Sequence, residues 1–266
     1  LGQPTDYSDK YAPELLCPIA RADSRARLGL SGDLPFHGSD IWNAWELTWL
    51  GAAGRPSVAT AEIIVPADSP NIIESKSLKL YLNSFAMSTF LSSSEVAETV
   101  ARDLSACAGK QTTVFVMPVQ DTEARLVSRL AGDCLDSLPV TCSEWQVDAS
   151  LLQADENTIV VEDLHTHLLR SLCPVTSQPD IGSLQIGYRG PKIDPASLLR
   201  YVVSFRQHSD FHETCVERMF IDILSRCEPE TLSIQARYQR RGGLDINPFR
   251  SNDTNDAPIN LRLWRQ

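Results

Sequence analysis

The stretch SLKLYLNSF at residues 77–85 returns 120 positions further along the chain as SLLRYVVSF at residues 197–205. The two copies share their first two residues, the central tyrosine and the closing Ser-Phe pair, in one register and without a gap. The same offset also pairs Leu104 with Leu224. Because a fixed period with a shared register indicates internal duplication, we expect two related modules.

The residue patterns predict the same order of elements in each half. A β-branched or alternating run predicts a strand, an amphipathic segment predicts a helix, and a second β-branched run predicts a closing strand. The strand, helix and closing strand span 58–65, 96–104 and 112–116 in the first half, and 184–188, 216–227 and 232–236 in the second. The repeated stretches themselves fit a strand or a helix, and this choice stays open. We therefore expect an α+β fold of tandem modules, each with an antiparallel sheet backed by helices.

The rest of the chain is assigned around these modules. We expect an N-terminal segment packed on the modules at 1–55, a first module at 56–120, a connecting insertion at 121–170 and a second module at 171–266. In the first segment Trp42, Trp45 and Trp49 recur at helical spacing, which predicts the packed face of a helix. The irregular stretch 118–167 is expected to join the two modules.

Composition narrows the class of protein. With 266 residues, 42% of them hydrophobic, the chain is long enough for one large core or two smaller ones. A net charge of -10 argues against direct nucleic-acid binding, which depends on Lys and Arg displacing counterions. There is no apolar run of the ~20 residues that a membrane span needs, and the polar start does not resemble a signal peptide. We expect a cytosolic protein whose seven cysteines are reduced thiols.

A metal site is not expected. The apolar residues around His165 and His167 recur at helical spacing, and side chains two apart on a helix point in nearly opposite directions. We therefore interpret both as residues on a helix surface. His208 and His212 are four apart, but no third ligand is evident near them.

The most informative positions are those at which the two copies differ. Glu74 and Lys76 lead into the first copy, whereas the matching segment of the second copy is DPA at 194–196. The His-Glu pair at 212–213 has no counterpart either, because the offset leads to two serines at 92–93. Two modules that each keep part of a polar set predict one composite site between them.

A turn-rich loop precedes the second module. It contains Cys173, followed by Pro174 and, seven residues on, by Asp180. A cysteine in such a rigid, irregular loop is typical of a fixed nucleophile, although an arbitrary cysteine is more often a small buried hydrophobe. The loop and the nearby acid favour the functional interpretation.

Five motifs together resemble one family, the two-module 7-cyano-7-deazaguanine reductases of queuosine biosynthesis. They are CPVTSQPD at 173–180, ESKSLKLY at 74–81, FHE at 211–213, LPFHG at 34–38 and RRGGLDINPFR at 240–250. The resemblance covers nearly the whole chain and implies the tunnelling fold, in which antiparallel sheets and paired helices assemble into barrels with sites at module interfaces. One departure is Ile181, where the family has an aromatic residue.

The resemblance also implies a chemistry. Cys173 would add to the nitrile carbon and form a covalent thioimide, and Asp180 would supply the proton for the nitrogen. Two NADPH molecules would then reduce this intermediate to the primary amine. Because Asp180 must hold a proton or take one from the thiol, a partly buried side chain is implied.

The resemblance also implies which residues bind the purine-like substrate. Glu74 and Glu213 match the positions that accept the two adjacent N–H donors of a guanine-like edge. His212 lies beside them, and the backbone around Ile73 and Ser75 completes the pocket.

The NADPH-contacting positions of the family match Ser75, Lys76, Arg241 and Gly242. Charge for phosphate would come from Lys76 and Arg241, and Arg240, Arg241 and Arg250 are the expected holders of the extra phosphate that distinguishes NADPH from NADH. No GxGxxG motif is present, so an ordinary dinucleotide-binding dehydrogenase is not expected. Module pairing in this fold makes a homodimer the expected assembly.

Two other functions remain open at this point. The first is a purine or pterin hydrolase or cyclohydrolase that anchors its substrate through Glu213, with Cys173 activating water or a metal. The second is a non-catalytic homologue that binds purine-like ligands. The missing metal-ligand set argues against the first, and the intact Cys173 and Asp180 argue against the second.

Overall fold

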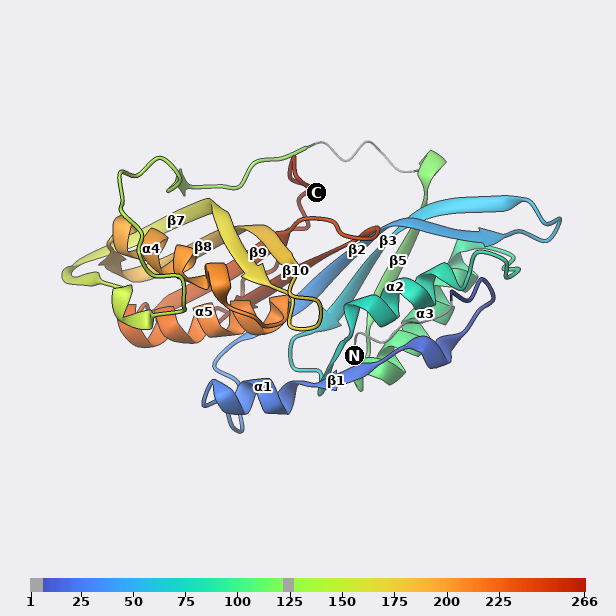
Figure 1. Cartoon of the computed structure of the whole chain (residues 1–266), viewed down its shortest axis with the longest axis horizontal. Helices are drawn as coiled ribbons and strands as arrows, with labels where there is room; N and C mark the ends of the chain where they lie inside the picture. The colour runs from blue at the N-terminus through green and yellow to red at the C-terminus, as the bar shows by residue number, and fades with distance from the viewer. Residues whose placement is uncertain (1–6, 122–126) are drawn as a thin grey trace.

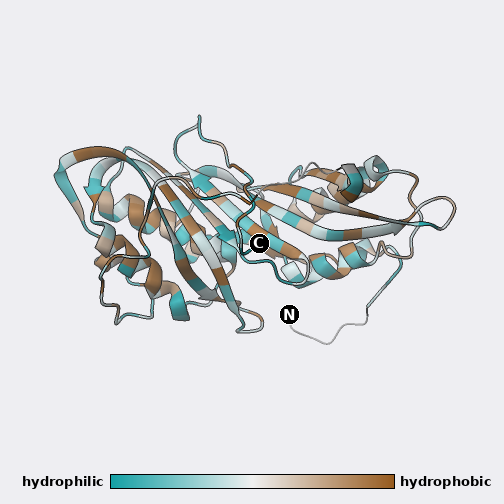
Figure 2. Ribbon diagram, turned by 90° about the horizontal axis from the view of Figure 1, so that it is seen from above, coloured by the Kyte–Doolittle hydropathy of each residue, from teal (hydrophilic) through white to brown (hydrophobic). Residues whose placement is uncertain are grey.

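One continuous sheet runs the length of the molecule (Figures 1 and 2). The computed structural model describes residues 7–121 and 127–266. The order in the sheet is β5-β3-β2-β10-β9-β8-β7-β6, and neighbours are antiparallel except β6 and β7, which are parallel. The strands are β2 (His37–Leu50), β3 (Pro56–Pro66), β5 (Thr113–Pro118), β6 (Asp133–Cys134), β7 (Ala154–Leu172), β8 (Pro179–Ile193), β9 (Thr231–Tyr238) and β10 (Leu244–Ser251). A separate antiparallel pair consists of β1 (Pro18–Ala20) and β4 (Asn71–Ile73).

Helices cover each half of this sheet, α2 and α3 over one half and α4 and α5 over the other (Figure 1). The α-helices are α1 (Arg21–Arg27), α2 (Ser75–Asn83), α3 (Ser93–Ala108), α4 (Pro195–Ser204) and α5 (His212–Cys227). Short 3₁₀ turns are η1 (Pro13–Leu15), η2 (Val119–Asp121), η3 (Ala149–Leu151) and η4 (Phe205–Gln207). The repeated stretches are therefore helical, which settles the choice that the sequence left open, and the expected α+β class is confirmed.

The duplication is visible in matching hydrogen bonds. The Glu74 carboxylate accepts from the backbone N–H groups of the second and third residues of α2, at 3.0 and 2.7 Å. Asp194 caps α4 in the same way, at 3.3 and 2.9 Å. The Tyr81 hydroxyl donates to an aspartate of α3 at 2.7 Å, and Tyr201 donates to an aspartate of α5 at 2.8 Å. The two halves thus share the same side-chain hydrogen bonds at equivalent positions.

Each half buries its own hydrophobic core between helices and sheet. Leu78 and Val96 lie in the core of the first half, and Leu198 and Phe220 lie in that of the second. Bands of hydrophobic and hydrophilic residues alternate along the strands (Figure 2), as expected for a sheet with one covered face. Burying such a side chain contributes roughly 1.5–3 kcal/mol, so the two clusters dominate the stability of the fold.

The two halves join where β2 pairs with β10. Five buried charged side chains lie at this junction: Arg21 and Arg25 of α1, Asp40 of β2, Glu217 of α5 and Arg250 of β10. The Arg250 guanidinium contacts one carboxylate oxygen of Asp40 and one of Glu217, each at 2.8 Å. Arg21 pairs with Asp40 at 2.5 Å and Arg25 with Glu217 at 2.7 Å. Because each of these five charges has a partner of opposite sign, the network joins the first half of α5 to β2.

Two segments with helical spacing are strands, so these expectations were wrong. The tryptophans at 42, 45 and 49 lie on β2, and the segment around His165 and His167 lies on β7. Each strand has a bulge, between Ala44 and Leu47 in β2 and between Thr166 and Leu169 in β7. An extra residue on one strand reverses the alternation, so buried residues on the two sides of a bulge are separated by an odd number of positions. That spacing resembles a helix.

The connecting stretch is also more regular than expected. Its last part, residues 154–167, belongs to β7, and part of the N-terminal segment forms β2 in the middle of the sheet. The expectations for residues 1–6 and 122–126 lie outside the described residues. Within the ranges that the structure covers, no helix is long and apolar enough to cross a membrane.

Candidate active site

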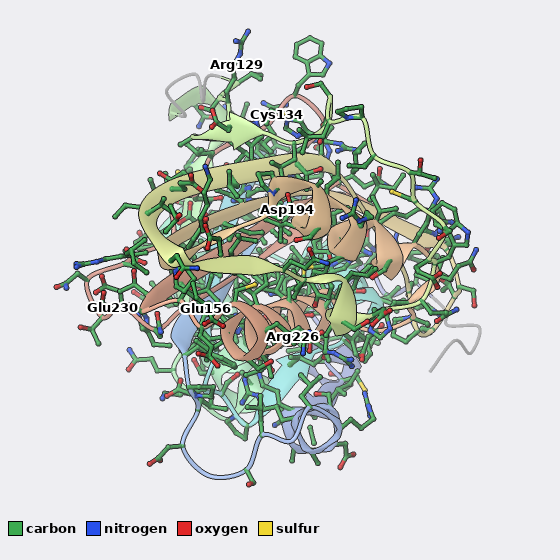
Figure 3. All side chains as sticks on the ribbon, turned by 90° about the vertical axis from the view of Figure 1, so that its left-hand side faces the viewer. Arg129, Cys134, Glu156, Asp194, Arg226 and Glu230 are labelled. Carbon is green, nitrogen blue, oxygen red and sulfur yellow. The ribbon has the colours of Figure 1, made fainter. Side chains whose placement is uncertain are left out.

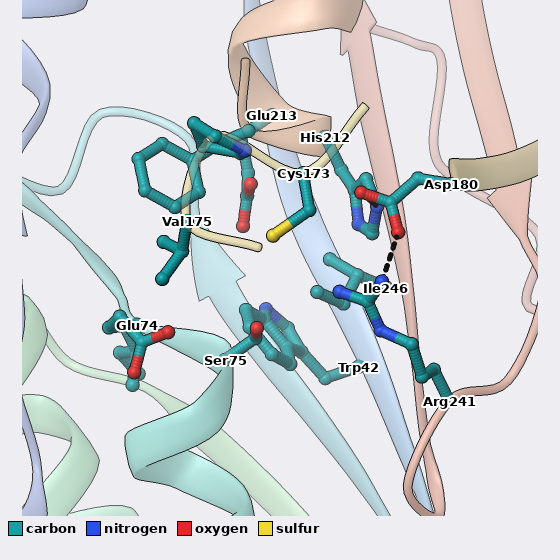
Figure 4. A pocket seen from close by; sticks show the side chains of 13 residues that line it. Trp42, Glu74, Ser75, Cys173, Val175, Asp180, His212, Glu213, Arg241 and Ile246 are labelled. Carbon is teal, nitrogen blue, oxygen red and sulfur yellow. Dashed lines mark ion pairs between the residues drawn. The ribbon is translucent and has the colours of Figure 1, made fainter. Parts of the chain in front are cut away.

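A pocket lies beside the junction of the two halves and is lined by both (Figure 4). Its empty volume, which includes space open to solvent, is about 350 Å³. The lining residues of the first half are Trp42, Ile73, Glu74 and Ser75. Those of the second half are Cys173, Pro174, Val175, Asp180, Phe211, His212, Glu213, Arg241 and Ile246. The pocket therefore gathers the candidate catalytic and substrate-binding residues into one composite site.

A tight turn between β7 and β8 holds Cys173. Its backbone N–H donates to the carbonyl of Gln178 at 2.9 Å, and its carbonyl accepts from the N–H of Ser177 at 2.9 Å. Ser177 has a φ of 57°, a left-handed conformation that closes the turn. The Cys173 side chain is buried and projects into the pocket (Figure 4). The turn thus fixes the position of the sulfur.

The surroundings of Cys173 favour the thiolate. Burial alone raises the pKa of the thiol, but the donors around the sulfur lower it by more. These donors are the side chain of Thr176, the backbone N–H groups of Val175 and Thr176, and the Arg241 guanidinium. The pKa of Cys173 is therefore below its usual value. Since the thiolate is the nucleophilic form, the site activates this cysteine.

Asp180 lies across the same pocket and contacts two basic side chains. One of its oxygens is 3.0 Å from the Arg241 guanidinium, and the other is 3.2 Å from Nε2 of His212. The His212 ring stacks on Tyr238, with 3.8 Å between centroids. Although Nε2 is close to Asp180, neither ring nitrogen makes a well-aligned hydrogen bond within the described part of the chain. The ring is thus held by stacking on Tyr238 and by the charge of Asp180, and Nδ1 is left for a ligand.

Glu213 lies in the first turn of α5 and is almost fully buried. Burial, and then repulsion from the nearby Asp40 carboxylate, raise the pKa of Glu213 to about 8, against the opposing charges of Arg21 and Arg250. The side chain is therefore mostly protonated at neutral pH. A ligand that offers N–H donors would favour its carboxylate form.

Glu74 enters the pocket while it caps α2. Each carboxylate oxygen has two lone pairs, and the cap uses one on each oxygen. One lone pair on each oxygen remains for two donors from a ligand. Glu74 and Glu213 thus present acceptors from the two halves of the chain to one cavity.

The expected cofactor residues are divided between the pocket and an adjoining groove. Ser75 and Arg241 line the pocket itself, whereas Lys76, Lys79 and Gly242 line the groove beside it. Gly242 has a φ of 61°, and a Cβ there would lie 3.1 Å from the Lys79 side chain, so glycine lets the loop approach the lysine. Burial, and then the charge of Arg241, lower the pKa of Lys79. This gathering of cationic side chains fits the phosphates of NADPH.

Some functional positions were missed or misplaced from the sequence. Trp42 lines the pocket, but its helical spacing with the other tryptophans concealed this role. Tyr238, which stacks on His212, gave no signal, because the contact is between residues far apart in the chain. Arg250 is fully buried in the junction network and so cannot hold a cofactor phosphate. Arg240 lies over the Trp45 ring, 5.6 Å from its centroid.

The loop that holds Cys173 and Asp180 accommodates the departure at Ile181. Ile181 pairs with Arg170 in the ladder between β7 and β8, and its carbonyl accepts from the N–H of Gln239 at 2.9 Å. The backbone that carries Asp180 is therefore regular at this point.

Two family models match the chain. The model described as "Nitrile reductase, 7-cyano-7-deazaguanine-reductase N-term" matches residues 7–116, and a model described as "QueF-like protein" matches residues 179–257. Among solved structures, the archaeosine synthase QueF-Like in the apo form is similar to 35% of this chain and 91% of its own, with 16% identity and a TM-score of 0.31. That likeness is too weak to carry an argument.

Full-length relatives give a stronger result. An NADPH-dependent 7-cyano-7-deazaguanine reductase of Paraburkholderia phymatum is 50% identical over 100% of this chain and 97% of its own. Those of Burkholderia lata and Azoarcus sp. are 52% and 53% identical, over 100% and 95% of this chain and 97% and 90% of their own. These relatives and the two family models show that the chain belongs to the NADPH-dependent 7-cyano-7-deazaguanine reductase family.

Proposed function

We propose that this oxidoreductase converts the nitrile of 7-cyano-7-deazaguanine to a primary amine through a covalent thioimide on Cys173. The observation that carries the proposal is the activated thiol of Cys173, in a pocket that also holds Asp180 and two carboxyl groups suited to a guanine-like edge. A nitrile carbon is a weak electrophile, so prior addition of a thiolate divides one difficult reduction into easier steps.

In the first step the sulfur of Cys173 forms a bond to the nitrile carbon, and one C≡N electron pair moves onto nitrogen. The nitrogen takes up a proton, which gives a neutral thioimide. Asp180 is the proton carrier. We infer that Asp180, which lines the same pocket, takes the proton that the Cys173 thiol gives up as it forms the thiolate and passes this proton to nitrogen.

NADPH, held by Ser75, Lys76, Arg241 and Gly242, would supply a hydride twice, so that two NADPH are consumed for each nitrile. Between the two reductions the C–S bond breaks and Cys173 leaves as a thiolate, giving an imine. A thiol with a low pKa is a better leaving group, so the donors around Cys173 assist this step as well as the first.

Substrate recognition is assigned to both halves. Glu213 and Glu74 accept from the adjacent ring N–H and amino groups of the purine-like edge, and His212 offers its Nδ1 beside them. Binding would ionise Glu213, because hydrogen bonds to a carboxylate favour its charged form. The backbone around Ile73 and Ser75 closes the pocket.

The proposal is tested by mixing the protein with 7-cyano-7-deazaguanine in the absence of NADPH. We expect a thioimide absorption band and a covalent adduct whose mass equals protein plus nitrile, located on Cys173 by peptide mapping. Cys173→Ala should give neither, and Cys142→Ala, a change in the connecting segment, should give both. An unmodified wild-type protein, or full turnover by Cys173→Ala, would contradict the proposal.

The hydrolase or cyclohydrolase alternative is less well supported. It requires Cys173 to activate water or a metal while Glu213 anchors the substrate, and the described residues that line the pocket include only one histidine beside that cysteine. Hydrolysis of a purine or pterin ring without consumption of NADPH would favour it.

We also propose that the chain is a cytoplasmic homodimer. Support comes from β5, which lies at the edge of the sheet and exposes Phe115, so that a second copy can extend the sheet there. Light scattering in solution should give twice the mass of the chain, and a monomer at all protein concentrations would exclude the dimer.

A further inference from the structure

Three metal-binding side chains gather outside the active site, at the edge of the sheet formed by β6 and β7. They are Cys134 on β6 and His165 and His167 on β7, and one ligand atom of each lies within 4.8 Å of those of the other two. Figure 3 shows Cys134 on the short strand beside β7. The helical interpretation placed the two histidines on opposite sides of an element. On a strand, residues two apart share a face, and their rings lie 5.4 Å apart.

Backbone contacts fix Cys134 beside the histidines. Cys134 is the register partner of His165 in the parallel pairing of β6 and β7, and the N–H of Leu135 donates to the His165 carbonyl at 2.9 Å. Gly132 has a φ of 78°, and a Cβ there would lie only 1.8 Å from the carbonyl oxygen of Asp163. Only glycine allows this close approach, so Gly132 permits the pairing of β6 with β7 at this point.

Both histidines use their Nδ1 atoms in hydrogen bonds. Nδ1 of His165 is 3.0 Å from the carbonyl oxygen of Ala131. Because a carbonyl only accepts, this nitrogen must carry the proton, which leaves the lone pair of the neutral ring on Nε2. Nδ1 of His167 is 2.8 Å from the hydroxyl of Ser183, which is fully buried. Bonds of this kind orient histidine ligands in metal sites.

We propose that Cys134, His165 and His167 bind a zinc ion. Thiolate and imidazole are the ligands that Zn²⁺ prefers, and in a tetrahedral site they lie about 3.3–3.6 Å apart. The observed cluster needs a contraction of about 1 Å, to which rotation of the exposed Cys134 side chain and small movements of the two imidazole rings would contribute. Three protein ligands leave the fourth position for water.

The bound ion would fasten the connecting segment to the second half of the sheet. The histidines and Cys134 also border a surface cavity that is lined by Leu130 and by Trp264 of the C-terminal segment. The metal would therefore tie β6 to β7 beside the chain end. This role is separate from the reductase chemistry, which takes place in the pocket of Cys173.

The test uses the reduced full-length protein and Co²⁺, which replaces Zn²⁺ and reports thiolate ligation as a charge-transfer absorption. We expect one Co²⁺ per chain, displaced by Zn²⁺, and loss of the thiolate band in Cys134→Ser. Cys142→Ser, in the same connecting segment, and Cys173→Ser, in the active site, should keep it. A band that survives Cys134→Ser or disappears with Cys173→Ser would overturn the assignment, as would the absence of binding to the folded wild type.

Two further variants separate ligation from structure. His165→Gln should lower Zn²⁺ affinity far more than Ser183→Ala, which removes only the partner of His167 and should weaken binding roughly 10- to 100-fold. Circular dichroism shows whether each variant is folded. Zinc should raise the unfolding temperature of the wild type and leave that of Cys134→Ser unchanged. An equal rise in both proteins would count against the site even if one of the histidine variants failed to fold.

Discussion

The two halves of the chain share one scaffold, but their helix N-termini are used differently. Glu74 and Asp194 cap α2 and α4 through the same pair of backbone bonds, yet only Glu74 lines the active-site pocket. At the next helix, the hydroxyl of Ser92 caps α3, accepting from the N–H of Glu95 at 3.1 Å. The matching end of α5 has no side-chain cap. The second half thus has no side-chain cap at the helix end that meets the pocket.

This difference shows where a duplicated fold places its function. The shared positions, such as the tyrosines of α2 and α4, maintain the core of each half. The positions at which the halves differ converge on the cavity between them, with Glu74 from one half and Glu213 from the other. Each half alone has an incomplete site, so the composite pocket depends on the junction of β2 with β10.

The largest effect is expected for Asp180→Asn. The amide keeps the size of the side chain but cannot carry a proton, so kcat should fall by about 10²- to 10⁴-fold while substrate affinity changes far less. Single-turnover measurement of thioimide formation, together with Kd for the nitrile, separates the two effects. Equal losses in rate and affinity would remove Asp180 from the role of proton carrier.

A second prediction concerns the pH dependence of stability. Glu213 has a pKa of about 8 in the folded protein and an ordinary value when unfolded, so the folded state binds the extra proton between these values. Stability from this group is thus complete below the ordinary pKa and is lost as pH rises toward 8. Between pH 5 and 7 the free energy of unfolding of the wild type should fall by about 2 kcal/mol relative to that of Glu213→Gln.

Urea unfolding at several pH values measures this effect. The control is Ser93→Ala, a change at the position that corresponds to Glu213 in the first half. It should leave the pH profile as in the wild type. Parallel curves for wild type and Glu213→Gln would show that Glu213 is not protonated in the folded state.

The third prediction compares the two caps directly. Glu74→Gln and Asp194→Asn should each cost about 1 kcal/mol of stability, because both weaken a helix cap. Only Glu74→Gln should also raise the KM for the nitrile, by roughly 10-fold, since a hydrogen bond to a charged acceptor is lost. Thermal unfolding and steady-state kinetics on both variants provide the measurements. A similar KM increase in Asp194→Asn would mean that weakening of the helix cap, and not loss of a contact with the nitrile substrate, causes the effect.

The smallest effect is expected for Lys79→Met in the groove beside the pocket. The same offset places Leu199, a core residue, at this position in the second half. Loss of the ammonium group should raise the KM for NADPH several-fold and leave the Kd for the nitrile unchanged, because one charge pair that still contacts water contributes about 1 kcal/mol. An unchanged KM for NADPH would place the cofactor phosphates elsewhere.

Much of the active site followed from local sequence features. The turn formers after Cys173 predicted a rigid loop, and the breaks in the repeat at Glu74 and at His212-Glu213 predicted a site shared by two halves. The structure brings these residues into one pocket. The pairing of Asp180 with Arg241 and the stacking of His212 on Tyr238 were not predicted, because each contact joins separate strands or loops.

The sequence by itself determined the duplication, the α+β class and the turn-rich loop that holds Cys173, because these depend on periodicity and on short-range turn chemistry. Only the tertiary structure decided that the segments around Trp42 and His165 are strands, since a bulged strand and a helix leave similar hydrophobic spacing and only pairing with neighbours distinguishes them. The same pairing brings His165 and His167 together with Cys134. Strand partners far away in the chain therefore decided what local spacing could not.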